Sequence, residues 1–145
     1  MDSSAEALVN TVNTVAVMVK GIALQFKQAF PHNFEVYKKA CQDGFLKTGN
    51  ILAVKDSELI LGERLIINFP IKMDWRMPAE YHYIESGLIA LVAYLKENPV
   101  KSLAIPALGC GSGGLDWRKV RPMIERHLGA LDISVWVYEP KPKLN

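Results

Sequence analysis

The chain has 145 residues, of which 50% are hydrophobic and 22% are charged, and its formal net charge is +2. These values fit one globular domain over residues 1–145, and the charge is too small to indicate a nucleic-acid-binding surface by itself. No segment approaches the roughly 18 apolar residues of a membrane span. The polar start MDSSAEAL is not a secretory signal, and two cysteines form no disulfide framework, so we expect a cytoplasmic protein.

Short β-rich runs alternate with helical patterns along the chain. In order, the predicted elements are a strand at 6–10, helices at 20–30 and 33–43, strands at 51–55 and 64–69, a helix at 80–97, a strand at 102–107, a helix capped by Asp116, and a strand at 133–138. Gly44 and Gly129 are predicted to end the second and fourth helices, and Pro122 favours a fourth helix that becomes regular only near that residue. Such alternation predicts an α/β sheet covered by helices on both faces.

The segment GCGSGG, residues 109–114, follows a predicted strand and reads G-x-G-x-x-G, the pattern of a dinucleotide-binding loop. Three observations oppose a complete dinucleotide-binding fold. Only six residues follow Glu139, Pro122 interrupts the helix that should leave the loop, and Trp117 is bulky where that helix should pack closely. A glycine-rich turn between a strand and a helix still presents backbone N–H groups to an anion. We therefore expect this loop to bind a phosphate group rather than to form a purely structural turn.

Cysteine and histidine give weaker signals. Cys110 is a candidate nucleophile at a helix N-terminus, but no C-x5-R spacing follows it and no histidine is near, so a small packed residue is the preferred interpretation. His32, His82 and His127 are scattered and form no ligand pair, so no metal site is predicted. His82 and Glu85 are three residues apart on a predicted helix, which is typical of a surface pair.

Lys72 lies just beyond the predicted strand 64–69, which is expected to end at Pro70. Ligands of open α/β sheets bind outside the carboxyl ends of the strands. A lysine at this place can contact a phosphate, act as a nucleophile towards a sugar carbon, or simply carry surface charge. From these residues alone, surface charge is the default interpretation.

Three long segments make the sequence recognisable. These are EALVNTVNTVAVMVKGIALQFKQAFP, IINFPIKMDW and SLAIPALGCGSGGLDWRKVRPMIE. Together they resemble macro domains, in the subgroup that contains the DarG antitoxins and the terminal ADP-ribose glycohydrolase, over nearly the whole chain. The resemblance implies a three-layer α/β/α sandwich around a mixed sheet, with ADP-ribose bound across the C-terminal ends of the strands and no further cofactor.

The resemblance also assigns roles to residues. Lys72 matches the catalytic lysine, which attacks the anomeric carbon of ADP-ribose and forms a covalent intermediate that water resolves. Asn13 would contact the distal ribose, and the glycine loop would wrap the diphosphate. The full set of implied ligand-binding residues is Asn10, Asn13, Lys20, Gly21, Ile22, Gly109, Cys110, Gly111, Ser112, Gly113, Gly114 and Leu115. Relatives remove ADP-ribose from thymidine in DNA or from acidic protein side chains, so ADP-ribosylated DNA or protein and a cognate ADP-ribosyltransferase toxin are the expected partners.

The chain departs from the family pattern in four places. The family's first strand has no counterpart before EALVN, which leaves an exposed sheet edge that could pair with a second copy of the chain. Two glycines of the first ligand loop are replaced by Ala16 and Val19. Asp74 replaces a histidine and is expected to pair with Lys72, which would oppose nucleophilicity. The human relative's loop aspartate falls near Gly113, so its role is not transferred, and Asp116 is interpreted as a helix cap.

These observations leave three hypotheses. The preferred one is a macro domain that hydrolyses ADP-ribosyl linkages, with DNA-directed antitoxin activity as one form. The alternative is a non-catalytic or degenerate ADP-ribose reader, which the change at Val19 and the missing first strand motivate. A dinucleotide-binding oxidoreductase is the remote third.

Overall fold

A computed structural model describes residues 4–17, 21–60 and 62–139. Its elements, in order, are β1 (Ala7–Asn13), α1 (Gly21–Ala29), α2 (Pro31–Gln42), β2 (Leu52–Glu58), β3 (Gly62–Lys72), α3 (Tyr81–Glu97), β4 (Ser102–Pro106), α4 (Trp117–Leu128) and β5 (Ser134–Tyr138). The strands form one sheet in the order β2-β3-β1-β4-β5. Strand β2 runs antiparallel to β3 and the other neighbours are parallel, so the sheet is mixed, as predicted.

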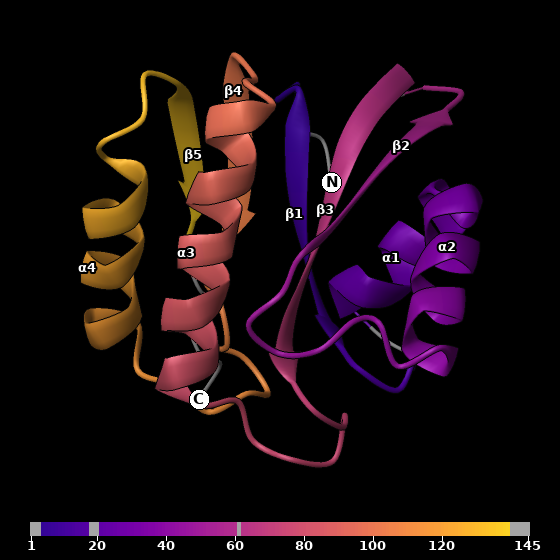
Figure 1. Ribbon diagram of the computed structural model, residues 1–145, viewed down its shortest axis with the longest axis horizontal. Coiled ribbons are helices and arrows are strands. Elements are labelled where there is room, and N and C mark those ends of the chain that lie inside the picture. The colour runs from indigo at the N-terminus through magenta and orange to yellow at the C-terminus, as the bar shows by residue number, and fades with distance from the viewer. Residues whose placement is uncertain (1–3, 18–20, 61, 140–145) are drawn as a thin grey trace, which may run out of the picture.

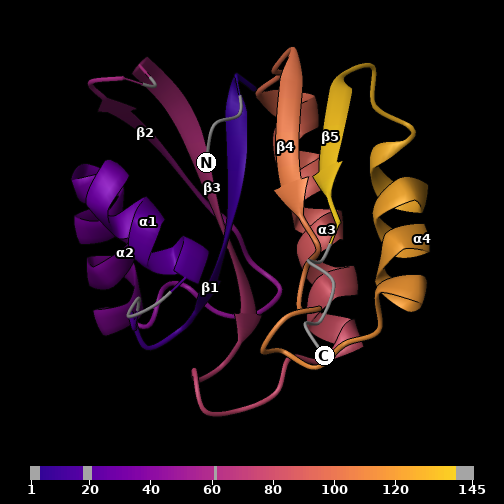
Figure 2. The same ribbon diagram turned by 180° about the vertical axis from the view of Figure 1, so that it is seen from behind.

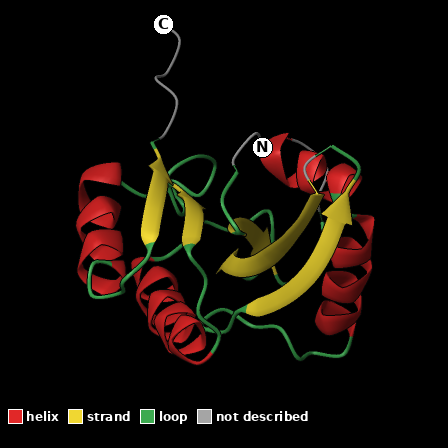
Figure 3. Cartoon of the chain, turned by 90° about the horizontal axis from the view of Figure 1, so that it is seen from above, coloured by secondary structure: helices red, strands yellow, loops and turns green. Residues whose placement is uncertain are grey.

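The sheet separates two layers of helices (Figures 1 and 3), with α1 and α2 against one face and α3 and α4 against the other. Side chains that alternate along each strand explain this arrangement. Ala7 and Val9 of β1 join the core under α3 and α4, whereas Leu8 between them packs with Phe26 and Phe30 on the α1 side. The expected three-layer α/β/α sandwich is therefore confirmed.

Helix α3 follows the predicted apolar face closely. Ile84, Leu88, Leu91 and Leu95 are all buried against the sheet. No side chain separates the helix from β3 at Gly87, where a Cβ atom would lie 2.4 Å from Cζ of Phe69. This close approach holds the start of α3 beside the end of β3.

The prediction for the end of β3 is wrong. The strand does not end at Pro70 but continues to Lys72, and β1 extends beside it to Asn13, with a bulge between Val12 and Asn13. The last β3 residue paired with β2 is Asn68, so Pro70 lies where β3 has only β1 as a neighbour. A proline is tolerated there because one side of the strand needs no N–H donor.

The prediction for the start of α4 is also wrong. The helix begins at Trp117, because Asp116 caps it by accepting a hydrogen bond from the Arg118 N–H. It continues through Pro122, because buried apolar side chains further along the helix offset the N–H donor that proline lacks. Gly129 ends this helix with φ of −63°, not in the left-handed region. Gly44, in contrast, ends α2 with φ of +71°, as predicted.

In the described residues the sheet has five strands, and none of them lies beyond β5. In these residues β5 is an outer strand, and its second edge pairs with no other strand. Pairing of that edge with a second copy stays a prediction. In the same part of the chain no helix has the length and apolarity needed to cross a membrane.

Candidate functional site

Three loops meet where β1, β3 and β4 end, at the lower end of the molecule in Figures 1 and 2. Hydrogen bonds join them to one another. The Thr14 hydroxyl, after β1, donates to the Met73 carbonyl at 2.6 Å, and the Ala79 amide donates to the Gly113 carbonyl at 3.1 Å. The segments that follow β1, β3 and β4 therefore form one connected surface at the edge where α/β sheets bind ligands.

Lys72 is the last residue of β3 and is 8% exposed. Its Nζ donates to the carbonyl of Ser112 at 3.3 Å and lies 3.4 Å from the Ser112 hydroxyl. The amine is thus directed into the glycine loop rather than into bulk water. The default interpretation of Lys72 as a surface charge is wrong, because the residue is buried.

The expected ion pair between Asp74 and Lys72 is not what the structure shows. Asp74 binds Arg76 instead, with Oδ1 accepting from Nε at 2.9 Å and Oδ2 accepting from Nη2 at 2.7 Å. The hydrogen bonds from Arg76 lower the pKa of the Asp74 carboxyl to about 2. The acidic side chain is therefore satisfied by a neighbour two residues away and does not oppose the lysine.

The glycine loop has a geometry that larger residues cannot adopt. Gly109 has φ of +73°, and a Cβ atom on Gly113 would lie 2.5 Å from the Gly109 carbonyl oxygen. The amides of Cys110, Gly114 and Leu115 are used within the loop, as donors to the carbonyls of Ala107, Gly111 and Gly109.

The amides of the three residues in the middle of the glycine loop have no such acceptors among the described residues. Within the described part of the chain, the N–H groups of Gly111, Ser112 and Gly113 donate to no acceptor. Successive free N–H groups in a turn of this kind favour an anion. The loop thus offers donors for a phosphate group beside the amine of Lys72.

Cys110 sits in this loop as a packed residue. Its side chain is partly buried against the core, and burial, with a smaller effect of the Asp116 charge, raises the pKa of the thiol to about 11. The thiolate is therefore scarce at neutral pH. The structure supports the small-packed-residue interpretation over a nucleophile.

Asn13 organises the first loop. Its Oδ1 accepts from the amides of Val15 and Val17 at 3.0 and 3.3 Å, and its Nδ2 donates to the Val17 carbonyl at 3.0 Å. Ala16, between them, has φ of +62°, the conformation that the family's glycine would adopt easily. Val19 and Lys20 lie outside the described residues.

The remaining predicted contacts lie near this loop or away from it. Gly21 and Ile22 begin α1, so the predicted helix N-terminus is where it was expected. Asn10 is placed differently, because it lies inside β1 and its fully buried side chain donates to Oδ1 of Asn68 at 3.3 Å. Asn10 therefore belongs to the core and does not open the ligand loop.

Sequence reasoning missed Tyr37. Its buried hydroxyl, on α2, donates to the Asn13 carbonyl at 2.7 Å and lies 3.3 Å from Asn13 Oδ1. Burial raises the pKa of this phenol, so it stays a donor. The two residues are 24 positions apart, and no local pattern links them.

Two of the three histidines lie beside glutamates. The predicted surface pair of His82 and Glu85 is wrong, because Glu85 on α3 binds Arg126 Nη2 and His127 Nε2 on α4, each at 2.9 Å. His82 lies 3.7 Å from Glu80. Among the described residues, no three histidine, cysteine or acidic side chains are grouped as metal ligands.

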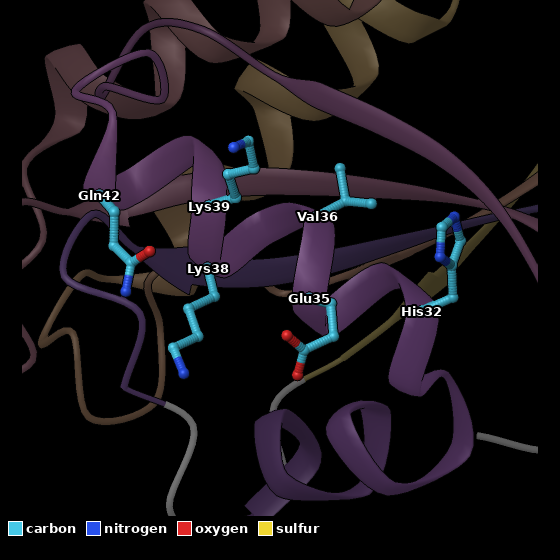
Figure 4. A pocket seen from close by; sticks show the side chains of 6 residues that line it. All are labelled: His32, Glu35, Val36, Lys38, Lys39 and Gln42. Carbon is cyan, nitrogen blue, oxygen red and sulfur yellow. The ribbon is translucent and has the colours of Figure 1, made fainter.

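A separate hollow of about 460 Å³ lies over the outer side of α2 (Figure 4). Its lining residues are His32, Glu35, Val36, Lys38, Lys39 and Gln42, all from one helix. It is a surface depression between solvated side chains, apart from the strand ends where Lys72 and the glycine loop meet.

The comparisons with known proteins agree with this geometry. The family model described as the macro domain matches residues 9–124. The chain belongs to the macro-domain family. The sheet order and this match set aside the dinucleotide-binding oxidoreductase, whose fold has a different strand order.

Several relatives are similar over most of this chain. A DNA ADP-ribosyl glycohydrolase of Thermus aquaticus is 50% identical over 97% of the chain and 39% of the relative. The macrodomain of Mycobacterium tuberculosis DarG has a TM-score of 0.91 at 44% identity, covering 97% of this chain and 92% of that structure. Thermosipho africanus DarTG in complex with ADP-ribose has a TM-score of 0.90 at 37% identity, covering 99% of this chain and 40% of that structure. The chain spans about two fifths of the length of the curated DNA ADP-ribosyl glycohydrolases it matches.

Proposed function

We propose that this macro domain binds ADP-ribose and hydrolyses ADP-ribosyl linkages on thymidine in DNA, with Lys72 as the nucleophile. The observation that carries the proposal is the position of the Lys72 amine, which is buried and 3.3 Å from the Ser112 carbonyl of the glycine loop. The similarity to proteins named DNA ADP-ribosyl glycohydrolase favours DNA over protein as the substrate. The similarity to a structure described as a complex with ADP-ribose supports the ligand.

In the proposed reaction, the free amides of the glycine loop hold the diphosphate and so place the distal ribose over β3. The neutral Lys72 amine attacks the anomeric carbon, a bond forms between Nζ and that carbon, and the bond to the base breaks. The base leaves with the bonding electron pair and takes a proton, while the amine loses one to solvent. Water then hydrolyses the lysyl adduct and releases ADP-ribose. Asn13 and Tyr37 act as positioning residues that fix the first loop.

The test is the Lys72→Ala variant on an oligonucleotide that carries one ADP-ribosylated thymidine. We expect kcat to fall at least 100-fold, because the covalent route is lost, while calorimetry shows ADP-ribose binding within a few-fold of the parent. Mass spectrometry of the quenched parent reaction should find an ADP-ribosyl adduct on Lys72. The matched control is Lys101→Ala, which should leave turnover unchanged. Lys101 is exposed and directly precedes β4, at the end of that strand away from the glycine loop.

Two results would contradict the proposal in different ways. Equal turnover by Lys72→Ala and the parent would exclude the lysine mechanism. Tight binding of ADP-ribose with no turnover by the parent would make the domain a reader of ADP-ribose instead of a hydrolase.

A partner follows from the same relatives. One of them, from Thermosipho africanus, is named a DNA ADP-ribosyl transferase-DNA ADP-ribosyl glycohydrolase fusion protein and is 39% identical to this chain. We propose that this domain, as an antitoxin, reverses the modification made by a DNA ADP-ribosyltransferase toxin.

A further inference from the structure

Three exposed apolar side chains lie in the loop that joins β3 to α3, directly after Lys72 in the chain. Met73, Trp75 and Met77 are 49%, 51% and 47% exposed. This loop extends furthest beyond the ends of the strands in Figures 1 and 2. Three large apolar side chains at alternate positions of a projecting loop cost solvation free energy unless something covers them in use.

The loop that carries the patch is held in place on both sides. The Thr14 hydroxyl of the first ligand loop donates to the Met73 carbonyl, and the Ala79 amide donates to the Gly113 carbonyl of the glycine loop. The patch, defined as Met73, Trp75 and Met77, is therefore continuous with the proposed ADP-ribose site.

The inside of the loop is a fixed turn. Asp74 Oδ1 accepts from the Arg76 amide at 3.0 Å, and the Met77 amide donates to the Asp74 carbonyl at 3.0 Å. The Asp74 carboxylate also fixes the Arg76 guanidinium, which lies 5.7 Å from the centre of the Trp75 ring. The turn thus presents an indole beside a guanidinium, and its only carboxylate is neutralised by that guanidinium.

We propose that this patch is a stacking platform for the bases that flank the ADP-ribosylated thymidine. The inference rests on the proposed function. Trp75 is three residues from Lys72, a separation of at most about 10 Å along the chain, so nucleotides flanking one bound at Lys72 are within reach. Aromatic rings beside arginine bind single strands because every base has a π face. Met73 and Met77 are exposed apolar side chains of the same loop, and methionine adapts its shape to a bound partner.

The experiment compares two substrates with Trp75→Ala. One substrate is a single-stranded oligonucleotide with one ADP-ribosylated thymidine, and the other is ADP-ribosylated thymidine alone. We expect kcat/KM for the oligonucleotide to fall about tenfold more than kcat/KM for the nucleoside, a size typical of losing one stacked base. Trp75→Phe should keep most of the oligonucleotide activity because it keeps a ring. Trp136→Ala, which removes a 44% exposed tryptophan on β5, is the matched control and should change neither substrate.

A second measurement does not depend on turnover. Fluorescence anisotropy with an unmodified labelled oligothymidylate should show binding that Trp75→Ala weakens about tenfold, while calorimetry shows ADP-ribose affinity unchanged. If the parent does not bind the oligothymidylate, or if the parent and Trp75→Ala bind it equally well, the platform is excluded even if hydrolysis is confirmed. If Trp75→Ala instead impairs only an ADP-ribosylated protein substrate, the patch contacts protein. If the parent binds the oligothymidylate but hydrolyses neither substrate, the proposed function fails while the platform stands.

Discussion

Ala16 occupies the left-handed region of backbone space in the loop that follows β1, with φ of +62°. An L-residue with a Cβ atom pays roughly 1–2 kcal/mol for this conformation. Asn13 enforces it, because its side chain bonds the backbone of Val15 and Val17 on either side. The loop therefore holds a left-handed residue without a glycine, and the strain is stored beside the candidate site.

Ala16→Gly should stabilise the protein. Relief of the left-handed strain outweighs the extra chain entropy of glycine in the unfolded state, so we expect a net gain of about 0.5–1 kcal/mol. Urea denaturation should show a higher midpoint with an unchanged slope. Ala93→Gly, on an exposed position of α3, is the control and should lose about 1 kcal/mol. If Ala16→Gly destabilised the protein, the left-handed conformation of Ala16 would hold no strain for glycine to relieve.

At the scale of single elements, the contact between α3 and β3 decides where Lys72 is held. Gly87 allows the helix backbone to rest on the Phe69 ring, and Phe69 lies three residues before Lys72 on the same strand. Phe69 and Ile84 are both fully buried in the same core. The position of the end of β3, and with it the lysine, depends on this packing.

Gly87→Ala should destabilise the protein by about 1–3 kcal/mol, because the new methyl group would lie 2.4 Å from Phe69 Cζ in a full core. The measurement is urea denaturation, with Gly111→Ala as a control for stability alone, since its Cβ would meet no atom within 4 Å. Phe69→Leu makes room for the methyl group, so the double variant should lose less than the sum of the single losses. Additive losses would show that the two residues are not in conflict.

Local patterns predicted the elements, and non-local partners decided their ends. The helix at 80–97 could be predicted because its apolar spacing lies within one segment, and α3 spans Tyr81–Glu97. The end of β3 could not, because Pro70 is tolerated only once β2 has stopped pairing at Asn68. The same holds in the site. The glycine loop was visible in six consecutive residues, whereas the contact of Lys72 with Ser112 joins residues 40 positions apart.

At the scale of the whole molecule, a buried asparagine network connects four elements of the N-terminal half of the chain, β1, α2, β2 and β3. Asn68 on β3 accepts from Nδ2 of Asn10 on β1 and from Nδ2 of Asn33 on α2, at 3.3 and 3.1 Å. It also donates to Asn33 Oδ1 at 2.8 Å and to the Leu52 carbonyl of β2 at 3.0 Å. One side chain thus fixes a helix and three strands relative to one another.

The substitution Asn68→Ala should therefore lower the free energy of unfolding of the whole molecule, rather than loosen one element. The truncation leaves the buried amides of Asn10 and Asn33 without their shared acceptor, and each orphaned group costs about 1–3 kcal/mol, so we expect a loss of roughly 3 kcal/mol. Urea denaturation should remain a single transition at a lower midpoint. Asn98→Ala is the matched control, because Asn98 is exposed and its side chain bonds only the nearby Tyr94 carbonyl, so its loss should stay below about 1 kcal/mol. Equal losses in the two variants would show that the network adds no more to stability than an exposed helix cap.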